Sequence, residues 1–266
     1  MVLLFIASLM VAAPLETTLS LAESRPLGLA RTYHVQGISL DPKRLYVSSV
    51  ERSARSGWLF VFDRATLTCQ QTCRLAIGNQ YHPGGMQLRD ARLHLPLAEY
   101  RASSSAVLLT IDVTGLDHEE KPQRRLMIHA SATLPDHVGG LACDDRGHRY
   151  AANWDCKLVR EIDPAGNVVR EFSNPTGVAY QEIEYHDAHL WCAGNLKGNG
   201  PERSLVDVID LVTKQVVRRY FLAGSRATGG SDFAHEGFTK EGNHLWFLPE
   251  DGPHSTLYRF DLPSAE

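Results

Sequence analysis

The sequence predicts an all-β fold made of five similar units, and three observations lead to this expectation. A short motif with an apolar residue after a Gly recurs along the chain, each copy is followed by strands that end in an Asp turn, and the final copy lacks its last strand. Self-similarity at intervals of 42 to 55 residues is typical of rings built from small sheets. The chain of 266 residues is therefore expected to form a five-bladed β-propeller.

Each unit opens with an anchor in its predicted innermost strand. The anchors are Gly37-Ile38, Gly85-Met86, Gly140-Leu141, Glu182-Ile183 and Gly237-Phe238. The fourth copy is degenerate, because Glu182 stands where the other units have Gly. A second strand follows about seven or eight residues later, in the segments RLYVSSV, RLHLPLA, HRYAANW, HLWCAGN and HLWFLPE. Short runs rich in apolar and aromatic residues, bounded by turn residues, indicate strands.

The third strand of each unit ends with an apolar residue and Asp, at Phe62-Asp63, Ile111-Asp112, Ile162-Asp163, Ile209-Asp210 and Phe260-Asp261. Turn residues follow, as an Asp-led hairpin requires. A fourth strand comes next in four units, whereas the fifth stops with the chain. Residues 26–33 precede the first anchor and are predicted to supply the missing strand. An N-terminal strand would then complete the last blade and close the ring.

Residues 23–266 are expected to form a single domain, and residues 1–22 have two interpretations. Residues 2–14 form an apolar run too short for a membrane span, and Ser20-Leu21-Ala22 is an acceptable cleavage site for a signal peptide. A signal peptide would place the mature protein in the periplasm or outside the cell. Because no Lys or Arg follows Met1, the segment could instead stay folded against the domain.

Charge and cysteine content exclude several classes. The formal net charge is −4, and Lys and Arg are scattered rather than clustered, which argues against a nucleic-acid partner. The five cysteines do not form a disulfide framework. No other segment is long and apolar enough for a membrane span. We expect a monomer that binds a small-molecule substrate or ligand.

Histidines recur where the innermost strands begin. His34, His82 and His137 lie three residues before their anchors, and His235 lies two residues before Gly237. Innermost strands lie nearest the axis, so these rings should converge on the mouth of the central channel. Imidazole nitrogen suits divalent transition metals, so one interpretation is a site for Zn, Fe or Mn. The other is that the histidines are structural and recur because the units are copies.

Carboxylates stand on the same face of the predicted ring. The second strand returns antiparallel to the first, so its end lies beside the histidines. Glu51, Glu99, Asp155 and Asp251 occupy these ends, and Glu236 follows the last of the four histidines. We predict that Glu51, Glu99, Asp155 and Glu236 orient the rings or act as general acid and base.

The phrases HVQGIS, HPGGM, DHVGGLA and AHEGF resemble an uncharacterised family of exported bacterial β-propellers. The arrangement of QG or EG anchors with Asp-led turns is also similar to the glutamine cyclotransferase, strictosidine synthase and gluconolactonase-like propellers. Those groups carry their sites on the axial face, so the resemblance implies a site there. Their calcium-binding pattern of acids and Asn is not reproduced at these His positions.

Two functions follow as hypotheses. The first is an exported metal-dependent enzyme, a hydrolase or lyase that acts on a small extracytoplasmic substrate, with oxygen chemistry as its second reaction type. The second is a non-catalytic propeller that binds a ligand, a glycan or a partner protein through the same face.

Overall fold

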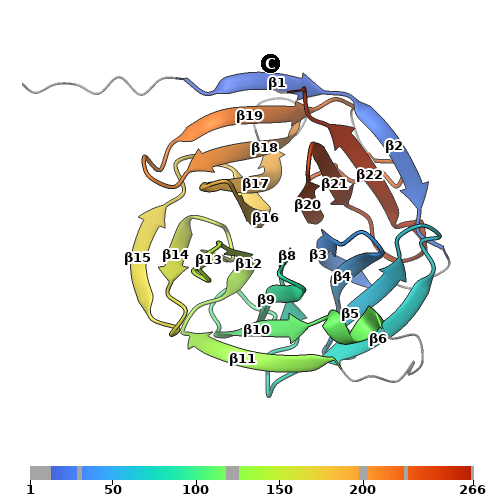
Figure 1. Ribbon diagram of the computed structural model, residues 1–266, viewed down its shortest axis with the longest axis vertical. Coiled ribbons are helices and arrows are strands. Elements are labelled where there is room, and N and C mark those ends of the chain that lie inside the picture. Colours follow the sequence, from blue (N-terminus) through green and yellow to red (C-terminus); the bar gives the residue numbers. More distant parts are fainter. Residues whose placement is uncertain (1–12, 29–31, 118–125, 198–202, 225–226, 265–266) are drawn as a thin grey trace, which may run out of the picture.

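Five antiparallel sheets surround a central axis in the computed structural model, which describes residues 13–28, 32–117, 126–197, 203–224 and 227–264 (Figure 1). Consecutive sheets follow one another around the ring, and each begins at the axis and ends at the rim. The predicted five-bladed β-propeller is therefore confirmed.

The first three blades follow one another along the chain. Blade 1 consists of β3 (His34–Leu40), β4 (Arg44–Glu51), β5 (Ser56–Asp63) and β6 (Cys69–Leu75). Blade 2 consists of β7 (His82–Pro83), β8 (Gln87–Arg89), β9 (Arg92–Ala98), β10 (Ala106–Asp112) and β11 (Met127–Leu134), with the 3-10 helix η1 (Thr114–Asp117) after β10. Blade 3 consists of β12 (Val138–Cys143), β13 (Arg149–Asn153), β14 (Leu158–Ile162) and β15 (Val168–Ser173).

The last two blades also contain strands from the N-terminal segment. Blade 4 consists of β16 (Ala179–His186), β17 (His189–Leu196), β18 (Arg203–Asp210), β19 (Val216–Leu222) and β1 (Leu15–Leu19). Blade 5 consists of β20 (Gly237–Glu241), β21 (His244–Leu248), β22 (Thr256–Asp261) and β2 (Leu21–Pro26), with the 3-10 helix η2 (Gly252–His254) before β22.

Closure of the ring is confirmed, and its strand lies earlier in the chain than residues 26–33. The antiparallel partner of β22 is β2, which pairs Leu21 with Phe260 and Pro26 with Thr256. The chain must then cross from the outermost position of blade 5 to the innermost strand of blade 1, which requires most of the segment assigned to the strand. In addition, β1 runs parallel to β19 at the rim of blade 4. The predicted domain start at residue 23 therefore falls inside β2, and cleavage after residue 22 would remove β1.

The side chain of Glu182 fills the axis. The Glu182 carboxylate accepts hydrogen bonds from the backbone N–H groups of Met86 and Phe238, and from that of Ile38. Each of these donors directly follows an anchor Gly. The Glu that made the fourth repeat look degenerate therefore joins the innermost strands of blades 1, 2 and 5 to blade 4.

The anchor glycines make room for this arrangement. A Cβ atom at Gly85 would lie 2.7 Å from Cγ of Glu182, and one at Gly37 would lie 2.8 Å from Cα of Gly85. Gly85 also exchanges backbone hydrogen bonds with blade 3, from Gly85 N to Gly139 O (2.8 Å) and from Leu141 N to Gly85 O (3.2 Å). A side chain at either Gly would push the innermost strands apart.

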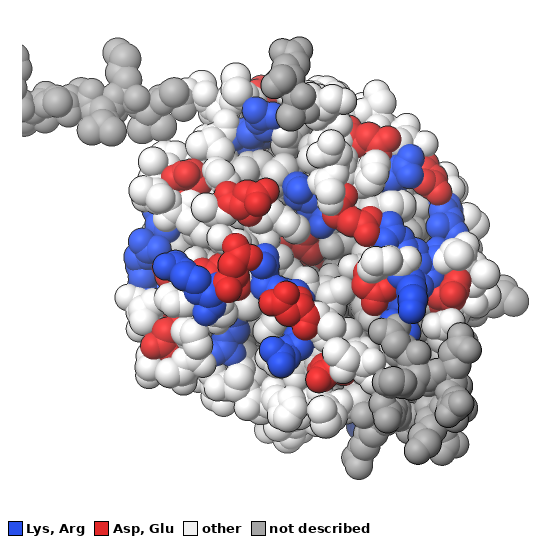
Figure 2. All heavy atoms as spheres, in the orientation of Figure 1, with Lys and Arg blue, Asp and Glu red and all other residues white. Residues whose placement is uncertain are grey.

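Two further observations describe the molecule as a whole. No helix within the described ranges has the length and apolar character needed to cross a lipid bilayer. Figure 2 shows acidic and basic side chains interspersed over the viewed face, so neither sign forms a continuous patch there.

Candidate functional site

A cavity of about 320 Å³ lies on the axial face that carries the predicted histidines. This volume is at the lower end of the range of small-molecule sites. The described residues that line it, called the axial pocket below, are His34, Gln36, Arg52, His82, Tyr100, His137, Gly139, Trp154, Tyr180, Gln181, His235 and Glu236. The convergence of all four predicted histidines on one cavity is what the repeat register led us to expect.

Bulges in the innermost strands form the floor of the axial pocket. The pairing register shifts between Val35 and Gly37 in β3, between Val138 and Gly140 in β12 and between Tyr180 and Glu182 in β16. A bulge adds one residue to a strand and re-aims a side chain. The extra residues are Gln36, Gly139 and Gln181, and all three line the pocket. Glu236 holds the same position, directly before its anchor, in blade 5.

The outer wall comes from the loops that follow the second strands. Arg52, Tyr100 and Trp154 stand at these positions in blades 1, 2 and 3. Each is the immediate neighbour in sequence of a predicted carboxylate. Successive side chains of an extended chain point to opposite sides, so a shift of one residue decides which of the two enters the pocket.

His82 and His137 lie together in the pocket, with ring centroids 5.2 Å apart. The amide oxygen of Gln36 can only accept, so Nε2 of His82 donates to it at 2.6 Å and Nδ1 keeps a lone pair. This Nδ1 is buried without a hydrogen-bond partner. His137 donates from Nδ1 to the carbonyl oxygen of Arg101 at 3.0 Å, which leaves Nε2 as its acceptor. Burial lowers the pKa of both rings, so both are neutral at pH 7.

His34 lies between two carboxyl groups. Asp251 accepts a hydrogen bond from Nδ1 of His34 at 2.9 Å, as expected of a carboxylate at the end of a second strand. Nε2 of His34 is 3.8 Å from Oε1 of Glu236, and Nε2 of His235 is 3.4 Å from the same oxygen. Burial raises the pKa of Glu236 well above its usual range, and the charge on Asp251 raises it further. Glu236 therefore holds its proton to a higher pH than an exposed Glu does.

The other three predicted catalytic acids do not line the axial pocket. Glu51 accepts a hydrogen bond from Nε1 of Trp58 at 3.2 Å and faces a neighbouring cavity. Glu99 pairs with Arg101 at 2.9 Å. Asp155 pairs with Lys157 at 2.6 Å, and this hydrogen bond holds the pKa of Asp155 below its usual value.

Two sets of contacts are recorded among the four histidines. The ring centroids of His82 and His137 are 5.2 Å apart, and Nε2 of His34 and Nε2 of His235 each approach Oε1 of Glu236. Within the part of the chain that the structure describes, no group of three or more His, Cys, Asp or Glu side chains is placed to hold a metal ion.

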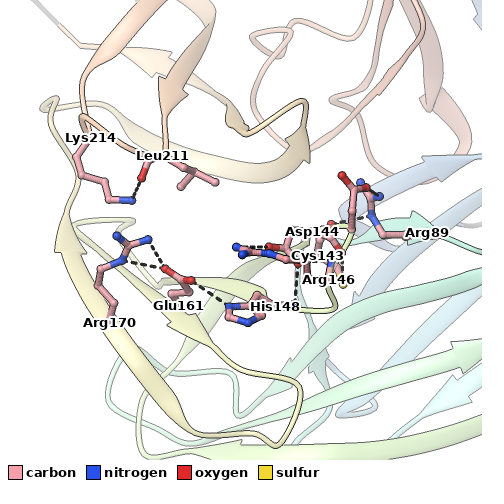
Figure 3. A network of polar contacts seen from close by, with 10 residues as sticks. Arg89, Cys143, Asp144, Arg146, His148, Glu161, Arg170, Leu211 and Lys214 are labelled. Carbon is pink, nitrogen blue, oxygen red and sulfur yellow. Dashed lines mark hydrogen bonds and ion pairs between the residues drawn. The ribbon is translucent and has the colours of Figure 1, made fainter.

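The opposite face of the ring, at blade 3, carries a different kind of polar network. Glu161 accepts from Nδ1 of His148 at 3.0 Å and from Nε of Arg170 at 2.9 Å (Figure 3). Burial would raise the pKa of Glu161, but these hydrogen bonds outweigh it and leave that pKa below its usual value. Closer to the axis, Arg89 donates to the carbonyl oxygen of Cys143 at 2.8 Å and pairs with Asp145.

No family model matches the chain, and no curated protein matches it in sequence. Among solved structures, the tail fiber of Staphylococcus aureus phage P68 aligns with a TM-score of 0.53 at 12% identity, covering 90% of this chain and 52% of that one. Virginiamycin B lyase from S. aureus aligns at 0.49 and 11% identity, covering 91% and 99%. Regucalcin from Agrobacterium tumefaciens, a calcium-binding protein, aligns at 0.48 and 13% identity, covering 93% and 97%. At these identities the likeness shows the β-propeller fold alone.

Proposed function

We propose that the axial pocket is the active site of a hydrolase or lyase that acts on a small extracytoplasmic substrate by acid–base catalysis. The observation that carries this proposal is the Asp251–His34–Glu236 arrangement at the pocket wall. Asp251 accepts a hydrogen bond from Nδ1 of His34, so Nε2 is directed toward Glu236, a carboxyl group whose pKa burial raises. A base and an acid held side by side are the two groups that both reaction types need.

The proton movements balance for both reactions. In a β-elimination, His34 takes a proton from carbon, the C–H electrons form the double bond, and the leaving group departs with its bonding pair and takes the proton of Glu236. In a hydrolysis, His34 takes a proton from water as the oxygen attacks, and Glu236 protonates the leaving group. Nε2 and Oε1 are 3.8 Å apart, beyond hydrogen-bond distance, so the proton on His34 returns to Glu236 through one water molecule.

Removal of either partner tests the assignment. We expect His34→Ala and Glu236→Gln each to lower turnover about 100-fold or more on any substrate found in a screen of esters, lactones and β-substituted acids. The matched control is His244→Ala, because His244 makes the same contact with Asp261 (2.7 Å) outside the axial pocket. Full turnover in both pocket variants would contradict the assignment, and stoichiometric ligand binding without turnover would favour the non-catalytic alternative.

A metal-dependent form of this chemistry is the second candidate, and the unpartnered Nδ1 of His82 beside His137 favours it. Two neutral rings can ligate Zn, Fe or Mn, although the described residues offer no set of three such ligands. Elemental analysis of the same preparations decides between the two forms. Metal at one equivalent that disappears in the His82→Ala/His137→Ala double variant supports this candidate, and equal trace metal in both proteins rules it out.

Export to the periplasm or medium is proposed on the apolar N-terminal segment. Because β1 is part of blade 4, an exported form that keeps this strand requires cleavage before Leu15 rather than after Ala22. The N-terminal residue of the exported protein, read by mass spectrometry, tests this.

A further inference from the structure

Arg52 is the one Lys or Arg among the described residues that line the axial pocket. It is exposed and directly follows β4. Its guanidinium carbon lies 5.1 Å from the centre of the Tyr100 ring. The guanidinium forms no ion pair or side-chain hydrogen bond with any residue that the structure describes, and this sets it apart from Arg101, which pairs with Glu99 nearby. A guanidinium that stacks on an aromatic ring and has no carboxylate partner in the protein can bind an anionic group of a ligand.

The position of Arg52 makes it reachable from outside. A second cavity of about 540 Å³ lies beside the axial pocket, and the two share His34 and Arg52. Burial has the largest effect on the pKa values of Glu236 and His82, and the charge on Arg52 also acts on both. Arg52 therefore stands at the entrance and acts electrostatically on the groups further in.

Aromatic rings form the wall that faces this charge. The ring centroids of His82 and Tyr100 are 4.5 Å apart, and those of His137 and Trp154 are 4.3 Å apart. The ring centroids of Tyr100 and Trp154 are 6.3 Å apart, and the two rings meet edge to face. Trp154 is 44% exposed, so part of its ring is accessible to a ligand. A flat apolar group would find van der Waals contact along this wall.

We propose that Arg52 is the specificity-determining residue of the site, and that the substrate is a small monocarboxylate whose flat or aromatic part rests against Tyr100 and Trp154. This deepens the proposed function and rests on the same pocket. A carboxylate matches the planar fork of one guanidinium. A phosphate dianion would require further cations, and none lines the pocket among the described residues.

Simple carboxylates test the proposal without knowledge of the substrate. We expect benzoate, titrated by calorimetry, to bind more tightly than acetate, whereas the uncharged isostere benzamide and inorganic phosphate bind more weakly than benzoate. Arg52→Ala should weaken benzoate binding about tenfold or more, with Arg52→Lys in between. The matched control is Arg55→Ala, because Arg55 lies in the same turn over the Tyr81 ring (5.2 Å) and does not line the pocket.

Each outcome decides the assignment separately from the acid–base proposal. Unchanged benzoate affinity in Arg52→Ala, equal affinity for benzamide, tighter binding of phosphate or no carboxylate binding would each overturn the carboxylate assignment. Turnover in His34→Ala tests catalysis and benzoate affinity in Arg52→Ala tests anion recognition, so a failure of either proposal gives a different result.

Discussion

The two faces of the ring use the same kinds of residue for different purposes. On the face opposite the axial pocket, in the outer strands of blade 3, Glu161 is buried but receives hydrogen bonds from His148 and Arg170, and its pKa falls. At the axial pocket, Glu236 is buried beside two histidines at 3.4 Å and 3.8 Å, and its pKa rises. Burial by itself therefore does not decide the charge of a carboxyl group. At Glu161 the hydrogen bonds from Arg170 and His148 outweigh burial, whereas at Glu236 the hydrogen bond from Nε2 of Gln36 at 3.5 Å does not.

At the axis itself, Glu182 shows a third arrangement. It is buried at the axis and surrounded by backbone donors from three other blades, so it holds the ring together rather than facing a ligand. Substitutions at Glu161, Glu182 and Glu236 test whether the three carboxyl groups differ in this way.

The largest effect is expected from Glu182→Ala. The substitution removes the acceptor for three buried N–H groups and leaves a void at the axis, so we expect a loss of about 3–5 kcal/mol in the free energy of unfolding. Urea denaturation followed by circular dichroism measures it. Glu236→Ala is the matched variant, and it should cost less than about 1 kcal/mol because the Glu236 carboxyl has few donors to leave unpaired. Equal losses in the two variants would contradict the distinction.

The next prediction concerns the direction in which the free energy of unfolding changes with pH. Burial raises the pKa of Glu236 above the unfolded value of 4.5. The folded protein therefore holds this proton more tightly, and the contribution to stability is full below pH 4.5 and is lost as the pH rises through the folded pKa. Glu161 has a lowered pKa, so its contribution is present above pH 4.5 and is lost as the pH falls.

Stability measured against pH in two variants separates these contributions. In Glu236→Gln, the decline of stability above pH 4.5 should become shallower by up to about 1.4 kcal/mol per pH unit. In Glu161→Gln, the loss of stability in acid should become shallower instead. The same change of slope in both variants would show that the two carboxyl groups do not differ in this respect.

The smallest effect is expected from Arg170→Ala. The Arg170 side chain is about half exposed, and His148 still donates to Glu161 when it is removed. We expect a cost of about 0.5–1 kcal/mol in the free energy of unfolding. Turnover and benzoate affinity should not change, and a fall in either would link this network to the axial pocket.

The sequence predicts the architecture and part of the pocket lining. The recurring anchors place three histidines in one register and His235 one residue out of it, and the structure brings all four to one cavity. The loop residues were harder to predict, because a position at the end of a strand does not show which of two neighbours turns inward. Arg52 rather than Glu51 enters the pocket in blade 1, and Tyr100 rather than Glu99 enters it in blade 2.

Two further features had weak signals. The bulges that place Gln36 and Gln181 in the pocket are visible in the sequence only as polar residues directly before an anchor. The structural role of Glu182 at the axis was not predicted, because a residue that departs from a repeat is usually interpreted as a loss of the repeat's function. A charged residue at a position nearest the axis is the signal that could have revealed it.

The pairing of β2 with β22 has a consequence for how the chain can be connected. Asp261 ends β22 beside Leu21, the first residue of β2, in the geometry that a hairpin bridges in the other four blades. A circular permutant that begins at His34 and joins the end of β22 to Leu21 through a short turn would have a continuous last blade. It would dispense with β1, and its ability to fold would show whether the ring needs that rim strand at all.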